Sequence, residues 1–422
     1  MTDYLTYCDL ARIAERIDCL ATMTEPGRPY SRLVFSPEFD TARAWLEQQF
    51  LAAGLACHVD DGGSLVGVRR GMRSDKKVII GSHIDTVPAG GRFDGIAGIV
   101  AALEVVHHLN DAKIDLPFDL EIVDYLGEEL NVWGTSCLGS RHMAGLVTAE
   151  MLDRVDAAGR RLGDEIARLG GSGRPQGERR ADADTIIACL ELHIEQATSL
   201  ESHGCDIGVV TGIPGIYRYA IDVTGQAGHS GTTQMTGRRD ALVAAADIIA
   251  ATSALATAIA SDDNQHFVAT IGKIDVFPNG AAIVPGAAQM TLDLRAASEQ
   301  GRLRFLDQFE THLASVRATR HCAIEVRPLA AAPPAPMDPG LQQLLAERAT
   351  ALGLKSMSIS SGAGHDTAHL SRIASAAMIF IPCRDGLSHC PEEFATTDAI
   401  AKGAAVLALA VLELAVLELA VD

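Results

Sequence analysis

The chain has 422 residues, of which 48 % are apolar and 21 % charged, the composition of a soluble globular protein with about two or three domains. This hydrophobic content excludes a mainly disordered chain. Lys and Arg total 35 and Asp and Glu total 54, so the formal net charge is −19. That balance opposes general binding to the phosphate backbone of nucleic acids and leaves carboxylates that could bind cations.

The termini and the cysteines indicate a cytoplasmic protein. We expect no secretory signal peptide, because the first 20 residues carry charges throughout. Residues 404–421 are strongly apolar, but Glu413 and Glu418 interrupt them, so a buried final helix is expected and a membrane span is not. The nine cysteines are scattered without a Cys-x-x-Cys pair, which indicates reduced thiols and disfavours a thiolate metal site.

The first half of the chain alternates between helix and strand patterns. Ser36 and Pro37 are typical of a helix cap and first turn, so a helix is expected over 37–46, and another over 96–110 after Asp94-Gly95. Short apolar runs predict buried strands over 77–83, 120–125 and 185–193. Strands separated by helices indicate an α/β sheet with crossover connections.

Residues 160–184 are polar and rich in glycine. Gly171-Ser-Gly173 is similar to the start of a dinucleotide-binding fingerprint, but position 176 is Gln and no strand precedes the segment. A surface loop is expected here.

From about residue 212 to 328 the pattern changes. Strands are expected over 217–223, 268–274, 290–295 and 322–327, and helices over 240–260 and 303–317. This order is typical of a ferredoxin-like two-layer unit. Prolines at 333, 334 and 336 then mark a return linker, before a helix over 341–352 and a sheet strand over 377–381. We therefore expect a discontinuous catalytic domain, residues 1–211 and 329–422, interrupted by an inserted α/β module, residues 212–328.

Residues that commonly bind metals follow the ends of the expected strands. His83 and Asp85 are two residues apart, so in extended chain they point to the same side, and a carboxylate near a ligand histidine commonly orients its ring. In an open α/β sheet, sites form beyond the carboxyl ends of the strands. The sequence therefore predicts that one sheet edge gathers His83, Asp94, Glu128, Glu129, His193 and His389.

The motifs around these residues resemble those of a known family. They are Gly-Ser-His83-Ile-Asp85-Thr-Val-Pro, Gly-Gly-Arg-Phe-Asp94-Gly, Glu128-Glu129, Glu191-Leu-His193-Ile-Glu195-Gln196, Gly228-His229-Ser230-Gly231-Thr232-Thr233, Asp293-Leu294-Arg295, Ser361-Gly-Ala-Gly364-His365-Asp366 and Arg384-Asp-Gly-Leu-Ser-His389-Cys-Pro-Glu-Glu. From about residue 36 to the C-terminus the chain is similar to dinuclear-metal amidohydrolases, in the branch of N-carbamoyl-L-amino-acid hydrolases and allantoate amidohydrolases. These are relatives of aminoacylases, dipeptidases and glutamate carboxypeptidases. The resemblance implies an α/β fold: a mixed-sheet, zinc-peptidase-like catalytic domain with an inserted ferredoxin-like dimerisation (lid) domain.

The resemblance also implies a role for each matching residue. Two divalent ions would bind, and Zn²⁺ suits the ligands, although Mn²⁺, Co²⁺ or Ni²⁺ are compatible with them. The implied roles are His83 and His193 on one ion, Glu129 and His389 on the other, Asp94 bridging both, Asp85 orienting His83 and Glu128 as general base. His229, from the partner subunit of a homodimer, would donate to the oxyanion.

Substrate recognition follows from the same resemblance. Arg295 would hold a substrate carboxylate by two parallel hydrogen bonds, and Gln196 with the Gly364-His365 turn would line the reacting group. Ala282 stands where family members often carry Asn, and it cannot hydrogen-bond through its side chain. This departure points away from the usual N-carbamoyl α-amino acid pocket, towards a bulkier or differently charged acid.

Several functions compete at this stage. The first is hydrolysis of a linear amide or ureido bond in a small carboxylate-bearing substrate, with carbamoyl-amino-acid hydrolysis ahead of allantoate hydrolysis. A dipeptidase or an N-acyl-amino-acid hydrolase would use the same site. A non-catalytic dimeric scaffold or sensor should lack ligands or the base, yet all are present, and an NAD-dependent enzyme lacks its fingerprint.

Overall fold

The computed structural model describes residues 3–73, 75–263 and 266–420, and these fold into two units. The first unit contains the residues up to Thr211, then Pro336–Ile359 and the chain from His365 onward. The second contains Gly212–Ala335 and Ser360–Gly364. Each unit has its own hydrophobic core.

Among the described residues, nine strands form the mixed sheet of the first unit, in the order β1-β2-β4-β3-β5-β15-β6-β13, with β14 beside β6. The four central strands β4, β3, β5 and β15 are parallel, and β2 and β6 flank them antiparallel. The strands are β1 (Ala56–Val59), β2 (Leu65–Arg69), β3 (Lys77–Ser82), β4 (Asp119–Asp124), β5 (Ile186–Ile194), β6 (Ile207–Ile213), β13 (Ala335–Pro336), β14 (Ser356–Ser360) and β15 (Ala376–Ile381).

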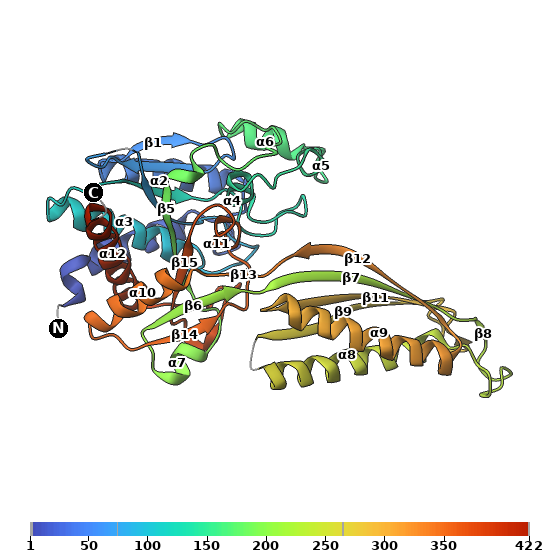
Figure 1. Cartoon of the computed structure of the whole chain (residues 1–422). Coiled ribbons are helices and arrows are strands. Elements are labelled where there is room, and N and C mark those ends of the chain that lie inside the picture. Colours follow the sequence, from blue (N-terminus) through green and yellow to red (C-terminus); the bar gives the residue numbers. More distant parts are fainter. Residues whose placement is uncertain (1–2, 74, 264–265, 421–422) are drawn as a thin grey trace. The chain divides into compact units, whose positions relative to one another are not determined.

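Helices cover both faces of this sheet because its central strands bury both sets of side chains. On β5, Leu190 and Leu192 belong to the large core beneath α3 and α12, whereas Cys189 belongs to a smaller core that contains Leu370 of α11. Figure 1 shows α12, in red, beside α3. The helices of this unit are α1 (Leu10–Thr22), α2 (Pro37–Ala52), α3 (Ile96–Asp111), α4 (Leu138–Met143), α5 (Ala149–Leu152), α6 (Leu162–Arg168), α7 (Ser199–His203), α10 (Pro339–Ala351), α11 (Thr367–Leu370) and α12 (Thr397–Ala420), with 3₁₀ turns at Tyr4–Tyr7, Ala183–Thr185 and Arg384–Gly386.

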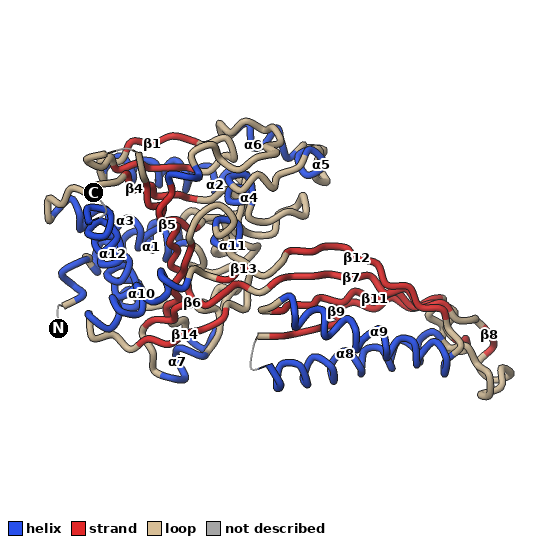
Figure 2. Tube along the Cα trace, viewed as in Figure 1, coloured by secondary structure: helices blue, strands red, loops and turns tan. Residues whose placement is uncertain are grey.

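The expected helix start at Ser36 is confirmed, and the expected loop at 160–184 is partly wrong. The Ser36 hydroxyl accepts a hydrogen bond from the Phe39 N–H at 3.1 Å and so caps α2. Within 160–184 the chain forms the short helix α6, which is visible among the loops in Figure 2. Leu162 and Ile166 lie four residues apart on one face of α6, and both are buried in the core.

Among the described residues, two helices are long and apolar enough to cross a membrane by length and composition, α8 (Ala241–Asp263) and α12. In α12, 67 % of the apolar window is buried inside the protein. The last helix therefore packs as a core helix of the first unit, as the interrupting Glu413 and Glu418 led us to expect.

The second unit is a four-stranded antiparallel sheet, β12-β7-β11-β9, covered by two helices. Figure 1 shows α8 and α9 side by side along this sheet. The β-α-β-β-α-β order and strand arrangement are those of the expected ferredoxin-like unit. The expected boundary at 328 falls inside β12, because that strand continues along β7 to Ala332. The remaining elements are β7 (Gly215–Thr224), β8 (Gly228–His229), β9 (Phe267–Phe277), β10 (Ile283–Val284), β11 (Ala287–Ala296), α9 (Glu299–Arg320) and β12 (Ala323–Ala332).

Candidate metal centre

The parallel strands of the first unit place side chains that could bind metal ions at one edge of the sheet. His83 directly follows β3, His193 is the next-to-last residue of β5, and Glu129 and His389 lie in the loops after β4 and β15. Two groups of ligand atoms form there, each with all its atoms within 4.8 Å of one another. The first group is His83, Asp94 and His193, and the second is Asp94, Glu129 and His389.

Asp94 belongs to both groups and offers one oxygen to each. Its Oδ1 lies 3.0 Å from His193 Nε2 and 3.5 Å from His83 Nε2. Its Oδ2 lies 3.2 Å from His389 Nε2, which is 3.3 Å from Glu129 Oε1. A carboxylate placed in this way can bridge two cations.

The donor set fits a pair of divalent ions. The Nε2 atom of His83 is buried without a hydrogen-bond partner among the described residues, although an unpaired buried nitrogen is costly. Its Nδ1 contacts the backbone oxygen of Asp85 at 3.0 Å, which turns Nε2 towards Asp94. Imidazole nitrogens and carboxylate oxygens in this arrangement are typical ligands of Zn²⁺ and of neighbouring transition metals.

The buried carboxylates of the cluster also need positive charge to balance them. Burial disfavours a charged His83, but the carboxylates of Asp85 and Asp94 outweigh burial and raise its pKa well above the usual value. Burial likewise opposes a charged Asp94, yet His193 beside it brings the pKa of Asp94 well below its usual range. The hydrogen bond to Asp94 is the main cause that raises the pKa of His389 to about 11. Protons or divalent cations can supply this positive charge, and cation binding would displace the protons.

Glu128 adjoins the first group without belonging to it. Its Oε2 lies 3.7 Å from His83 Nε2, and the side chain is buried. Burial is the largest cause that raises the pKa of Glu128 well above its usual value, and the neighbouring Glu129 carboxylate adds to it. A carboxylate whose pKa is raised accepts a proton more readily.

Asp85 contacts both halves of the site. Its carboxylate accepts the backbone N–H groups of Glu128 and Glu129, both at 3.2 Å, while its Oδ1 lies 3.6 Å from His83 Nδ1. The side chain therefore fixes the two glutamates at least as directly as it orients His83.

The chain turns tightly around His83 and needs glycine to do so. Gly95 opens α3 with a φ of +70°, a conformation that side chains rarely adopt. A Cβ atom at this position would lie 2.4 Å from His83 Nε2. Any larger residue at position 95 would therefore displace the ligand ring.

Gln196 and His365 lie against the ligands. Gln196 Nε2 donates to Asp94 Oδ2 at 2.7 Å, and the His365 ring lies 4.6 Å from that of His193, centroid to centroid. Burial, followed by the charge of His193, holds the pKa of His365 well below its usual value, so its ring stays neutral. Gln196 and His389 both have φ values near +60° although neither is glycine, and such strained residues cluster at functional sites.

Sequence reasoning missed Glu393, which supports the loop of Asp94. The buried Glu393 carboxylate accepts the N–H groups of Phe93 at 2.8 Å and Asp94 at 3.0 Å through Oε1, and the Ser388 hydroxyl at 2.8 Å through Oε2. Gly91 makes room for it, because a Cβ atom there would lie 1.9 Å from Glu393 Oε1. The signal was present in the Cys-Pro-Glu-Glu segment just after His389.

The remaining predicted site residues lie in the second unit, two of them at one tip. His229 is exposed on β8, and its Nδ1 accepts the N–H groups of Gly231 and Thr232 at 3.2 and 3.3 Å. The neutral ring then carries its proton on Nε2, which can donate. Ala282 is next to it, since its backbone oxygen accepts the Ser230 N–H at 2.9 Å.

Arg295 and Gly364 lie elsewhere in the second unit. The Arg295 guanidinium is about one-third exposed and donates to Asp293 Oδ1 at 3.2 Å and to the Gly362 oxygen at 2.9 Å. Gly364 is two residues further along the same loop and packs against Ile216, with a Cβ atom there 3.6 Å from Ile216 Cδ1. The loop of Gly364 is thus tied to Arg295 through Gly362.

Comparison with known proteins identifies the family. Residues 79–413 match the model of the peptidase family M20/M25/M40. An N-carbamoyl-L-amino-acid amidohydrolase of Pseudomonas sp. (strain NS671) is 34 % identical over 379 residues, which is 89 % of this chain and 91 % of the relative. An allantoate amidohydrolase of Bacillus subtilis (strain 168) is 32 % identical over 381 residues, 89 % of this chain and 90 % of the relative.

Solved structures agree. The crystal structure of an amidase of the hydantoinase/carbamoylase family from Burkholderia multivorans is 33 % identical, covers 96 % of this chain and 98 % of its own, and superposes with a TM-score of 0.86. The resemblance inferred from the sequence motifs is confirmed. The chain belongs to the peptidase family M20/M25/M40.

Proposed function

We propose that the chain is a metal-dependent amidohydrolase that cleaves a linear carbon–nitrogen bond in a small carboxylate-bearing substrate, most specifically an N-carbamoyl-L-amino acid. One observation carries the proposal. Two groups of candidate metal-ligand atoms share Asp94, and the carboxylate of Glu128, which belongs to neither group, lies beside them. The relatives named N-carbamoyl-L-amino-acid amidohydrolase support the choice of substrate.

In this proposal His83 and His193 would hold one divalent ion, Glu129 and His389 would hold the other, and Asp94 would contribute to both. Zn²⁺ is the first choice, with Mn²⁺, Co²⁺ or Ni²⁺ as alternatives. When bound, such a pair lowers the pKa of water and polarises the scissile carbonyl.

Glu128 acts as the general base and then as the general acid. Its buried carboxylate accepts the proton of the attacking water and returns it to the leaving nitrogen, so that one group serves both steps. Asp85 keeps Glu128 in place through the backbone N–H. Products from a carbamoyl substrate would be the amino acid, carbon dioxide and ammonia.

The second unit supplies charge and orientation. His229 donates from Nε2 to the oxyanion of the tetrahedral intermediate, and the Arg295 guanidinium binds the substrate carboxylate. Gln196, His365 and Gly364 line the reacting group in the same proposal.

We further propose that the enzyme is a homodimer built through the second unit, and that His229 serves the partner subunit's site. β9 is an edge strand, and its Val268, Ile274 and Phe277 are 40 to 50 % exposed. The adjoining α8 is apolar, yet only 33 % of its apolar window is buried. Exposed apolar edges of this kind commonly mark an interface.

We also propose a cytoplasmic location, because none of the nine cysteines forms a disulfide bond.

Allantoate is the second candidate substrate. Ala282 offers only a methyl group beside His229, which leaves room for a bulkier acid, and the Bacillus subtilis relative is named for that reaction. A panel of N-carbamoyl-L-amino acids, N-acetyl-L-amino acids, dipeptides and allantoate separates the candidates. We expect ammonia release from the carbamoyl substrates, and turnover of dipeptides alone would contradict the proposal.

A further inference from the structure

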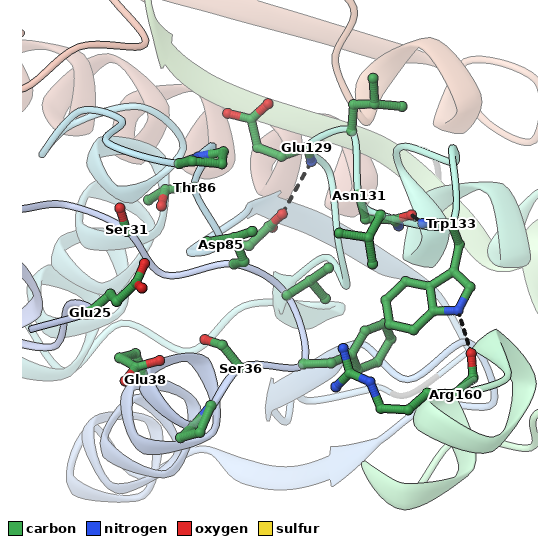
Figure 3. A pocket seen from close by; sticks show the side chains of 17 residues that line it. Glu25, Ser31, Ser36, Glu38, Asp85, Thr86, Glu129, Asn131, Trp133 and Arg160 are labelled. Carbon is green, nitrogen blue, oxygen red and sulfur yellow. Dashed lines mark hydrogen bonds between the residues drawn. The ribbon is translucent and has the colours of Figure 1, made fainter. Parts of the chain in front are cut away.

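A cavity of about 390 Å³ lies in the first unit next to the metal-ligand cluster. Asp85 and Glu129 form one of its walls (Figure 3), where the Glu129 N–H donates to Asp85 Oδ2 at 3.2 Å. Glu129 also carries a ligand oxygen of the second group. The cavity therefore begins at the residues that support the cluster.

The other walls of the cavity are largely apolar. Phe35 and Trp133 pack edge to face, with ring centroids 5.4 Å apart. Leu130 and Val132, in the loop directly after Glu129, are 59 and 61 % exposed, although both are large apolar residues. Apolar side chains left exposed beside a concave site are typical of ligand contacts.

The charged side chains that line the cavity differ in how far a counter-ion balances their charge. The Arg160 guanidinium lies 5.4 Å from the centroid of the Trp133 ring and is paired with Asp156 at 2.7 Å. Glu25 and Glu38 lie on another side of the cavity. Glu25 Oε2 is 3.9 Å from Arg28 Nη1, whereas Glu38 has no counter-ion within 4 Å among the described residues. An acidic ligand would meet negative charge there that is only partly balanced.

We propose that this cavity binds the side chain of the substrate and selects large apolar or aromatic side chains over small or acidic ones. The inference rests on the proposed function, because it assigns a place to the side chain of the same N-substituted amino acid. The reacting bond stays at the cluster, and the side chain enters between Val132 and the Phe35–Trp133 pair. Glu38 and Glu25 disfavour a side-chain carboxylate.

Steady-state kinetics on three carbamoyl substrates test this proposal. Each buried methylene contributes about a fourfold gain, so burying two to four of the side-chain carbons should raise kcat/KM for N-carbamoyl-L-norleucine above that for N-carbamoylglycine by about 16- to 250-fold. The kcat/KM for N-carbamoyl-L-glutamate should be lower than that for N-carbamoyl-L-norleucine by at least about tenfold.

Two variants with matched controls assign that preference to the cavity. Val132→Glu should lower kcat/KM for the norleucine substrate at least about fivefold and change kcat/KM for the glycine substrate less than about twofold. Val155→Glu is the control, because Val155 is equally exposed but lies outside the cavity, and it should change neither value. Glu38→Gln should improve the glutamate substrate about two- to fivefold relative to norleucine, and Glu47→Gln on the same helix should not.

Three results would overturn the proposal. Equal kcat/KM values for glycine and norleucine would show that no side-chain pocket operates. Equal losses on both substrates in Val132→Glu would place the pocket elsewhere. Failure of the metal-loaded enzyme to hydrolyse any carbamoyl substrate, glycine included, would instead overturn the proposed function, and the side-chain pocket with it.

Discussion

The Glu393 carboxylate accepts the backbone N–H of Asp94 at 3.0 Å, across 299 residues of sequence. It thereby fixes the one carboxylate that belongs to both groups of ligand atoms. Ser388, whose hydroxyl lies 3.0 Å from Asp94 Oδ2 and 2.8 Å from Glu393 Oε2, links the same carboxylate to the loop of His389. Metal ligands are commonly oriented by such outer partners.

Glu393→Gln should weaken metal binding by about 10- to 100-fold, because the amide holds the Asp94 loop less well. The measurement is the chelator concentration that removes half of the bound metal from the folded protein. Glu392→Gln, at the exposed neighbouring residue, is the control and should behave as the wild type. Unchanged metal affinity in Glu393→Gln would show that the backbone alone positions Asp94.

Arg295→Met should lower kcat/KM for carboxylate-bearing substrates by about 10- to 150-fold, mostly through KM, because one charge-assisted hydrogen bond contributes about 1.5–3 kcal/mol. Arg295→Lys should recover part of this loss, since it keeps the charge without the planar fork. If Arg295→Met leaves KM unchanged, another residue binds the carboxylate.

Ala282→Asn should improve N-carbamoyl-L-α-amino acids if the amide restores a missing donor beside His229. It should impair a bulkier native substrate if Ala282 makes room for it. Kinetics on both classes decide between these outcomes, and an unchanged profile would show that position 282 does not line the pocket.

A mixed dimer tests whether His229 acts in the partner's site. Glu128→Gln and His229→Ala homodimers should each be nearly inactive, because each lacks one group in both sites. A verified heterodimer should recover part of the activity, since one of its two sites then has both groups. No recovery would place His229 in its own subunit's site or outside catalysis.

Because of the buried His369, we expect the free energy of unfolding to decrease in acid. Burial, followed by the charges of Arg141 and Arg372, lowers its pKa to about 3, from 6.5 in the unfolded chain. The unfolded state therefore binds a proton that the folded state excludes, and the stabilisation present above pH 6.5 is lost as the pH falls towards 3. Below pH 6.5 the loss is about 1.4 kcal/mol per pH unit at most.

The comparison uses urea unfolding of the wild type and His369→Gln at pH 7.5 and 5.5. Between pH 7.5 and 5.5 the free energy of unfolding of His369→Gln should decrease by about 1 kcal/mol less than that of the wild type. His203→Gln, at an exposed histidine, should follow the wild type. Equal pH dependence in all three proteins would show that His369 does not stay neutral when folded.

The fold and the gathering of the candidate ligands at one sheet edge could be predicted because local pattern and topology agreed. The apolar runs of β3 and β5 marked buried strands, and the rule for parallel sheets placed His83 and His193 at one edge. β6 was missed because glycines interrupt its apolar residues although most of the strand is buried, and β14 was missed because serines alternate with its apolar residues. Their pairing depends on tertiary contacts that no local window contains.

Within the site, the candidate ligands were easier to predict from the sequence than the residues that support them. A histidine at a strand end is visible in sequence, whereas the contact of Glu393 with the Asp94 loop depends on two distant loops meeting. The helix α6 was missed for a related reason, because it is short, lies within a polar, glycine-rich segment and has just two large apolar residues, Leu162 and Ile166, in the core.

Glu128→Gln, measured for metal content and turnover beside Glu129→Gln, tests the central claim most directly. Glutamine is nearly isosteric with glutamate but cannot accept the proton of water, so Glu128→Gln should keep two equivalents of metal and lose turnover by about 10²–10⁴-fold. Glu129→Gln should instead lose metal, because its carboxylate belongs to the second ligand group. Parallel loss of metal and activity in Glu128→Gln would make that residue a ligand, and full activity would contradict its role as the base.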